Sequence, residues 1–175
     1  DHLYIGITSL EEGLAVDPNY LCCTFRGSVV KIHAATGRMI WETFTIDQIA
    51  TLQGKSSQGS AVWGPSGASV WSAPTLETKL RRVYVATSDN YSHPATDSSD
   101  AIMAISMDTG EHIWTYQGLA GDVWNVACHN DDTTNCPDDA GPDEDMGSSP
   151  LLITLPSGKR ILAAGQKTGV IHVVD

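Results

Sequence analysis

Residues 29–41, with the sequence VVKIHAATGRMIW, are repeated with a shift of 73 positions as residues 102–114, IMAISMDTGEHIW. The Thr-Gly pair and the closing tryptophan stand in register in both copies, and residues 170–175 begin a third copy. Internal repetition indicates a fold that uses one supersecondary unit several times. Each unit reads as a strand, a tight turn at Thr-Gly, and a second strand that ends in tryptophan.

The glycine and the tryptophan of each copy have separate expected roles. Gly37 and Gly110 suit tight turns because glycine accepts a positive φ without a Cβ clash. Trp41 and Trp114 each offer a large flat surface with one N–H donor, which can hold one repeat against the next.

Further strand-like runs stand between the copies, and no window shows a sustained helical period. These runs cover residues 3–7, 82–87, 151–154 and 160–164. Short antiparallel strands with one tryptophan per repeat predict an all-β fold, a β-propeller. A β-sandwich is the alternative, but it does not account for the repeated T-G-x-x-x-W pattern.

The composition indicates a folded, acidic protein. Of 175 residues, 41% are hydrophobic and 18% charged, and the formal net charge is −11. A disordered chain would be poorer in apolar residues and richer in charge. No apolar run approaches the ~18 residues that cross a bilayer. No cluster of Lys and Arg is present that would bind nucleic acid. We therefore expect neither a transmembrane segment nor a nucleic-acid partner.

The four cysteines are placed in pairs. Cys22 and Cys23 are adjacent, while Cys128 and Cys136 enclose a short polar segment. An even number in paired positions favours disulfides and an oxidising compartment such as a periplasm. Four cysteines allow three connectivities, and buried unpaired thiols remain the alternative. Zinc is not expected, because there is no C-x-x-C motif and no histidine pair at ligand spacing.

The repeat and the segments around it resemble one known family. The T-G-x-x-x-W repeat resembles the tryptophan-docking motif of alcohol dehydrogenases that depend on pyrroloquinoline quinone (PQQ), which are propellers of about eight blades. Among these the chain is most similar to polyvinyl-alcohol-dehydrogenase-like quinoproteins. The segments that carry the similarity are CCTFRGSVV, SGASVWSAPT, YVATSDNYSHP, GDVWNVAC, NCP, GPDEDMGSSP and AGQKTGV.

The resemblance implies a fragment of an eight-bladed β-propeller. The chain starts at Asp1 rather than Met, with no charged-then-apolar signal segment, and it stops within a strand pattern. At about 40–45 residues per simple blade, the chain is too short to close such a ring. We therefore expect residues 1–175 to be part of a single PQQ-binding domain, with about two to four blades and both ends truncated.

The resemblance also implies a cofactor site. Cys22 and Cys23 resemble the vicinal disulfide that lies against the quinone ring in the family, and Trp71 resembles the tryptophan on the opposite face. Ser69 stands at a Thr/Ser position of the family, and Arg26 is similar to an arginine that contacts PQQ. Outside this context, Trp71 would be read as core packing and Arg26 as a surface charge.

The resemblance implies a metal, usually Ca²⁺, which takes oxygen ligands. Asn90 or Asp89 is the candidate for the family's asparagine ligand, and the two positions remain open. The family's glutamate ligand has no clear counterpart, which leaves the identity of the metal open. Lys167 matches the basic residue that hydrogen-bonds the quinone oxygens and stabilises charge on the reduced ring.

The position of the catalytic base needs a choice. The family's aspartate commonly follows a tryptophan, but Asn125 follows Trp124 here, and an amide cannot accept the proton. The sequence Asp143-Glu144-Asp145 keeps the family's D-x-D before a proline. Asp143 is therefore the expected base, with Asp145 as a second carboxylate near the metal.

This choice makes residues 125–142 an insertion pinned by a Cys128–Cys136 disulfide. Asp122 is the second candidate for the base. The alternative without function is an acidic, solvated loop.

The implied function is PQQ-dependent oxidation of an alcohol, secondary or polymeric, to an aldehyde or ketone, with electrons passed to a cytochrome c. The implied location is periplasmic or secreted. Two alternatives remain: a non-catalytic propeller that binds proteins as a scaffold, and an inactive enzyme in which Asn125 marks the lost base. Cys22, Cys23, Arg26 and Lys167 favour the enzyme, because a scaffold has no need of them.

Overall fold

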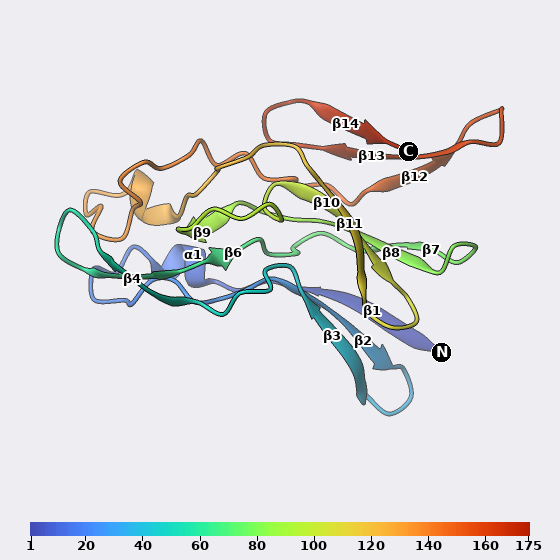
Figure 1. Cartoon of the computed structure of the whole chain (residues 1–175), viewed down its shortest axis with the longest axis horizontal. Helices are drawn as coiled ribbons and strands as arrows, with labels where there is room; N and C mark the ends of the chain where they lie inside the picture. Colours follow the sequence, from blue (N-terminus) through green and yellow to red (C-terminus); the bar gives the residue numbers. More distant parts are fainter.

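The structure is a computed structural model that describes residues 1–175, and it is almost entirely β (Figure 1). Three larger antiparallel sheets follow one another along the chain. The first contains β1 (His2–Ile7), β2 (Ser28–His33) and β3 (Met39–Phe44). The second contains β7 (Thr75–Glu77), β8 (Arg82–Ala86), β10 (Ala101–Ser106) and β11 (His112–Gln117). The third contains β12 (Leu151–Thr154), β13 (Arg160–Gly165) and β14 (Ile171–Val174).

Four short strands and two helical segments complete the chain. The strands are β4 (Thr51–Lys55), paired with β5 (Ala61–Gly64), and β6 (Ser66–Gly67), paired with β9 (Asn90–Ser92). The helical segments are α1 (Glu11–Leu14) and the 3₁₀ helix η1 (Val126–His129). Neither has the length and apolar character of a membrane-crossing helix. The expected all-β class is confirmed, and the four strands predicted between the repeats are β1, β8, β12 and β13.

The sequence repeat corresponds to one strand pair in each of the first two sheets. The first copy forms β2 and β3, and the second forms β10 and β11. Gly37 and Gly110 have φ values of +68° and +79° in the turns, as their expected role requires. The strand register shifts after Lys31 in the first copy and after Ala104, its equivalent, in the second. The two copies therefore share even a bulge.

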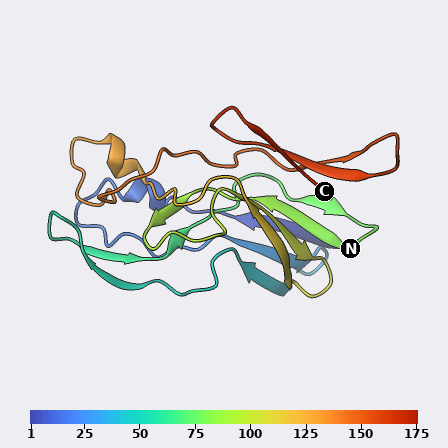
Figure 2. The same cartoon turned by 45° about the horizontal axis from the view of Figure 1, so that its top comes forward.

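The middle sheet is covered on both faces, as Figures 1 and 2 show. Every residue of β10 from Ala101 to Ile105 is buried, because successive side chains point to opposite neighbours. One face packs against Val29 of the first sheet and against Val70 of the connection before β7, in one hydrophobic cluster. The other packs in a cluster with the third sheet, which includes Leu162 and Ala164. The hydrophobic core of the chain therefore lies between neighbouring sheets.

Trp41 holds the first sheet against the second. A Cβ on Gly110 would lie 2.9 Å from the Trp41 ring, so the glycine turn of one repeat receives the tryptophan of the one before. The hydroxyl of Thr43 donates a hydrogen bond to the carbonyl of Gly110. Because the indole N–H of Trp41 has no acceptor, packing supplies this docking.

The meander places the long connections at one end of the sheets, on the left of Figure 1. In an antiparallel meander, alternate connections lie at the same end. The connections at this end span residues 8–27, 45–74, 87–100, 118–150 and 166–170, and they contain all the short strands and helices. The predicted site residues lie in these connections.

Candidate active site

Three aspartates from two connections meet at the loop end. Asp89 follows β8, and Asp143 and Asp145 precede β12. One carboxylate oxygen of each lies within 4.8 Å of the other two. Asp89 and Asp145 are 1% and 5% exposed, whereas Asp143 is less deeply buried. The structure thus brings together three of the residues predicted as base and metal ligands.

Lys167, in the turn between β13 and β14, joins this cluster. Its ammonium forms ion pairs with Asp143 and, at 2.9 Å, with Asp145. The Lys167 N–H donates to the backbone carbonyl of Asp145 at 3.0 Å, and the Asp145 carboxylate accepts the N–H of Asp89 at 2.8 Å. Asp145 therefore connects all three segments that build the site.

Asp122, the second candidate for the base, shapes the turn that carries the first. Its buried carboxylate accepts the backbone N–H of Glu144 at 2.8 Å and that of Asp143 at 3.4 Å. Asp143 has a φ of +63°, a conformation that a residue with a Cβ rarely adopts. The carboxylate of Asp122 thus stabilises the backbone that presents Asp143.

The electrostatics of the cluster favour a bound cation. Burial, together with repulsion from Asp145 and Glu12, raises the pKa of Asp89 to about 11. Both carboxylate oxygens of Asp89 are buried without a hydrogen-bond partner. Burial raises the pKa of Asp145, although its hydrogen bond from Lys167 opposes this. Burial would lower the pKa of Lys167, but hydrogen bonds to Asp143 and Asp145 outweigh it and raise the pKa. One ammonium therefore faces an excess of carboxylates.

Glu12 of α1 is a fourth carboxylate near this cluster. Burial raises its pKa to about 7, and repulsion from Asp145 and then Asp143 acts in the same direction. This glutamate was not among the predicted site residues. The available signal was a carboxylate in the connection after β1, which is at the same end of the sheets as Asp89.

Trp71 lies beside the cluster with much of its ring exposed. Its side chain is 47% exposed, and a Cβ on Gly147 would lie 2.9 Å from its six-membered ring. Gly147 follows Asp145 by two residues, so the aromatic ring packs against the segment that carries Asp143 and Asp145. Ser69 is buried instead, and its hydroxyl pairs with that of Ser88 at 3.0 Å, next to Asp89.

Both predicted disulfides are present. Cys22 bonds to Cys23, and Cys128 bonds to Cys136 with a Cα–Cα distance of 4.8 Å. The vicinal pair is almost fully buried and packs in a cluster that includes Tyr91 and Ala127. The second disulfide closes the insertion between η1 and the segment before Asp143.

The family model for the β-propeller domain of PQQ glucose, ethanol and alcohol dehydrogenases matches residues 13–133. The chain belongs to this family. Two relatives named polyvinylalcohol dehydrogenase are similar over 99% of the chain. The one from Sphingopyxis sp. (strain 113P3) is 38% identical over 175 residues, and the one from Pseudomonas sp. is 37% identical over 173. The chain covers 27% of the length of each relative.

Solved structures agree with the propeller fold. The quinohemoprotein alcohol dehydrogenase from Comamonas testosteroni superposes with a TM-score of 0.62 at 20% identity, over 99% of this chain and 25% of that one. The predicted resemblance and the fold of a propeller fragment are therefore confirmed.

Two predicted residues of this PQQ-family chain make contacts away from the cluster. The Arg26 guanidinium donates to the carbonyls of Ile46 and Asp47 at 3.0 and 3.1 Å, and it lies 3.9 Å above the ring of Phe44. The amide of the fully buried Asn90 is bonded to Ser66 and Thr96. Of the two open metal-ligand positions, the structure places Asp89 in the cluster.

Glu11, also missed from the sequence, organises the segment after the vicinal disulfide. Its buried carboxylate accepts the backbone N–H of Phe25 at 2.6 Å and that of Thr24 at 2.9 Å. It also accepts the hydroxyl of Tyr20 at 2.9 Å. In this family member, Glu11 therefore fixes α1, which carries Glu12, to the disulfide segment.

Proposed function

We propose that the full-length protein oxidises an alcohol with PQQ and a divalent cation, Ca²⁺, and that this chain contributes the reactive centre. The observation that carries the proposal is the carboxylate cluster with Lys167, in a chain of the PQQ family. A non-catalytic scaffold has no use for buried, mutually repelling carboxylates, which destabilise a fold unless a cation binds them.

The residues of the cluster fit a calcium ion. Ca²⁺ takes six to eight oxygen ligands, and carboxylates are its preferred side chains. The two unpartnered oxygens of Asp89 are the best-placed donors, and one carboxylate oxygen of Asp145 lies within 4.8 Å of an oxygen of Asp89. Asp89 and Asp145 would hold the ion, with Glu12, whose charge repels both, as a further candidate ligand.

The surroundings of the cluster also fit a planar, anionic cofactor. The exposed face of Trp71 suits stacking on a flat ring, and the ammonium of Lys167 suits hydrogen bonding to quinone oxygens. The chemistry supplied by the bound groups is hydride acceptance by PQQ and Lewis-acid polarisation by Ca²⁺.

Asp143 is the residue that accepts the hydroxyl proton of the alcohol at its carboxylate. It is the more accessible member of the aspartate cluster, with 21% of its side chain exposed. Its carboxylate forms an ion pair with the ammonium of Lys167, and a positioned carboxylate is a group that can serve as general base. Asp122 holds its backbone, so the carboxylate is presented in one orientation.

We further propose a secondary or polymeric alcohol as substrate, a cytochrome c as electron acceptor, and a periplasmic or secreted location. The names of the two curated relatives support the polymeric alcohol. The two disulfides, with no free cysteine, support an oxidising compartment. The family resemblance supports the acceptor.

The test is reconstitution of the full-length protein with PQQ and Ca²⁺, followed by an assay of dye-linked oxidation of secondary alcohols. We expect oxidation that depends on both additions, and the same preparation should then reduce cytochrome c. Absence of PQQ binding at micromolar concentration would contradict the proposal.

A further inference from the structure

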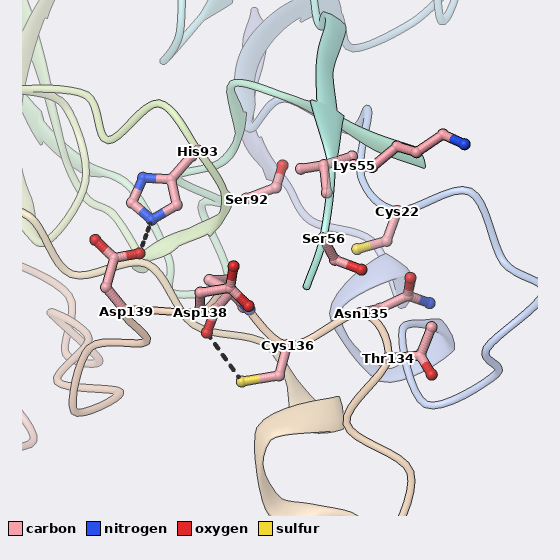
Figure 3. A pocket seen from close by; sticks show the side chains of 12 residues that line it. Cys22, Lys55, Ser56, Ser92, His93, Thr134, Asn135, Cys136, Asp138 and Asp139 are labelled. Carbon is pink, nitrogen blue, oxygen red and sulfur yellow. Dashed lines mark hydrogen bonds and ion pairs between the residues drawn. The ribbon is translucent and has the colours of Figure 1, made fainter. Parts of the chain in front are cut away.

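A polar cleft lies beside the vicinal disulfide, between the β4–β5 hairpin and residues 134–139 (Figure 3). Its volume is about 180 Å³, and only three of its twelve lining residues are hydrophobic. Cys22, Ser56, Ser92 and Asp138 are among its lining residues. Ser56, Ser92 and Asp138 have no role in the proposed reaction.

The walls of the cleft are fixed by specific bonds. The side-chain amide of Asn135 donates to three backbone carbonyls of the connection after β1, at 2.9–3.1 Å. Gln58, at the tip of the hairpin, is hydrogen-bonded to Thr133 and Thr134 of the insertion. At another edge, His93 bonds to Asp139 at 2.6 Å. The Cys128–Cys136 disulfide closes the insertion itself, so the cleft is preformed.

The chemistry of the lining suits hydroxyl groups. The side chains of Asp138 and Lys55 have neither a hydrogen bond nor an ion pair, so one acceptor and one donor remain available. The hydroxyl of Ser56 accepts a bond from Ser60 at 3.3 Å and keeps its own proton to donate. A ligand hydroxyl both donates and accepts, and can satisfy all three. Acidic and basic side chains both line the cleft, so the lining does not select an ion.

The cleft is also close to the reactive cluster. Ser92, which lines the cleft, is three residues along the chain from Asp89, and three residues of extended chain span about 10 Å. A small alcohol cannot reach both places at once, whereas an extended chain of hydroxyl-bearing carbons can. From these observations we propose that the cleft is a binding subsite for a neutral polyhydroxylated chain whose reacting end lies at Asp143. The proposal rests on the proposed oxidation of a polymeric alcohol and adds the place on this chain that holds the part of the substrate away from the reacting carbon.

The test compares poly(vinyl alcohol) oligomers of increasing length with isopropanol, using the full-length protein loaded with PQQ and Ca²⁺. For the wild type, KM should fall with oligomer length until the chain fills the cleft. The double variant Ser56→Ala and Asp138→Ala should raise KM for long oligomers about three- to tenfold, with kcat and the kinetics of isopropanol unchanged. The control is Asp97→Ala, an exposed acid outside the cleft, which should leave all values unchanged.

The outcomes separate the two proposals. The subsite alone is overturned if the protein oxidises isopropanol but its KM for oligomers does not depend on their length. The same holds if this KM is equal in the variant and the wild type. Failure to oxidise any alcohol overturns the proposed function. In that case, calorimetric titration of the protein with a long oligomer still decides the subsite. Weaker binding by the double variant than by the wild type supports the subsite. Equal binding by the two proteins, or no binding by the wild type, overturns it.

Discussion

Substitution of Asp89 by asparagine should stabilise the metal-free fold, and calcium should remove most of this advantage. The carboxyl of Asp89 is 1% exposed, both of its oxygens lack a partner, and its pKa is about 11. At neutral pH the metal-free folded chain therefore holds a proton on Asp89 that the unfolded chain releases. Asparagine has almost the same shape and no charge to bury, so the variant folds without the free-energy penalty of protonating Asp89.

The size of the penalty follows from the pKa. Because the pKa of Asp89 is raised in the folded chain, the contribution of this carboxyl to stability is fully present below its ordinary pKa of 3.8. This contribution is lost as the pH rises toward 11. Each pH unit above the ordinary value costs about 1.4 kcal/mol, which gives an upper limit of about 4 kcal/mol at pH 7. Without metal, Asp89→Asn should therefore stabilise the fold by ~2–4 kcal/mol at pH 7 and by almost nothing at pH 4.

The assay is urea denaturation of the full-length protein in EDTA and in excess Ca²⁺. A concentration of calcium about 100 times its Kd should stabilise the wild type by ~2.7 kcal/mol, and the variant by much less. The matched control is Asp97→Asn, an exposed acid of the next segment, which should behave as wild type. A variant that is less stable than wild type in EDTA, or that gains as much from Ca²⁺, would refute the reasoning.

Three further substitutions test the scaffold of the site. Glu11→Gln should lower the free energy of unfolding by about 1–3 kcal/mol, because one of the buried backbone N–H groups it satisfies loses its acceptor; an unchanged denaturation midpoint would contradict this. Trp41→Ala should destabilise by about 3–5 kcal/mol, since the Gly110 turn loses its packing partner; thermal unfolding measures it, and a loss below about 1 kcal/mol would argue against docking by packing. Replacement of both Cys128 and Cys136 by serine should speed amide hydrogen exchange in residues 126–142 while the three sheets keep their protection; unchanged exchange there would show that the disulfide does not order the insertion.

The repeat made the fold predictable because it is a local pattern. Gly37, Gly110 and Trp41 carry their roles in their chemistry, and the strand runs between the copies have the right length and residue types. The β4–β5 hairpin and α1 were not predicted. All five residues of β4 are exposed, β5 and α1 have only four residues each, and none of these segments has a hydrophobic period to detect.

The site was predicted in part, for a different reason. The meander brings Asp89, Asp143 and Lys167 to one end of the sheets, although they are far apart in the sequence, and the family motifs supplied this information. Motifs do not show which side chains are already engaged. The structure shows Asn90 and Arg26 bonded to backbone and side-chain groups of neighbouring loops. The charge of Glu12 interacts with the cluster, but no motif marks this residue.

The most direct test of the central claim is the turnover of Asp143→Asn in the full-length protein reconstituted with PQQ and Ca²⁺. If Asp143 accepts the hydroxyl proton, kcat should fall by about 10²–10⁴-fold while the affinity for PQQ stays within about twofold of wild type. Asp131→Asn, an exposed acid of the same connection between β11 and β12, should keep full turnover. Full turnover by Asp143→Asn would contradict the account.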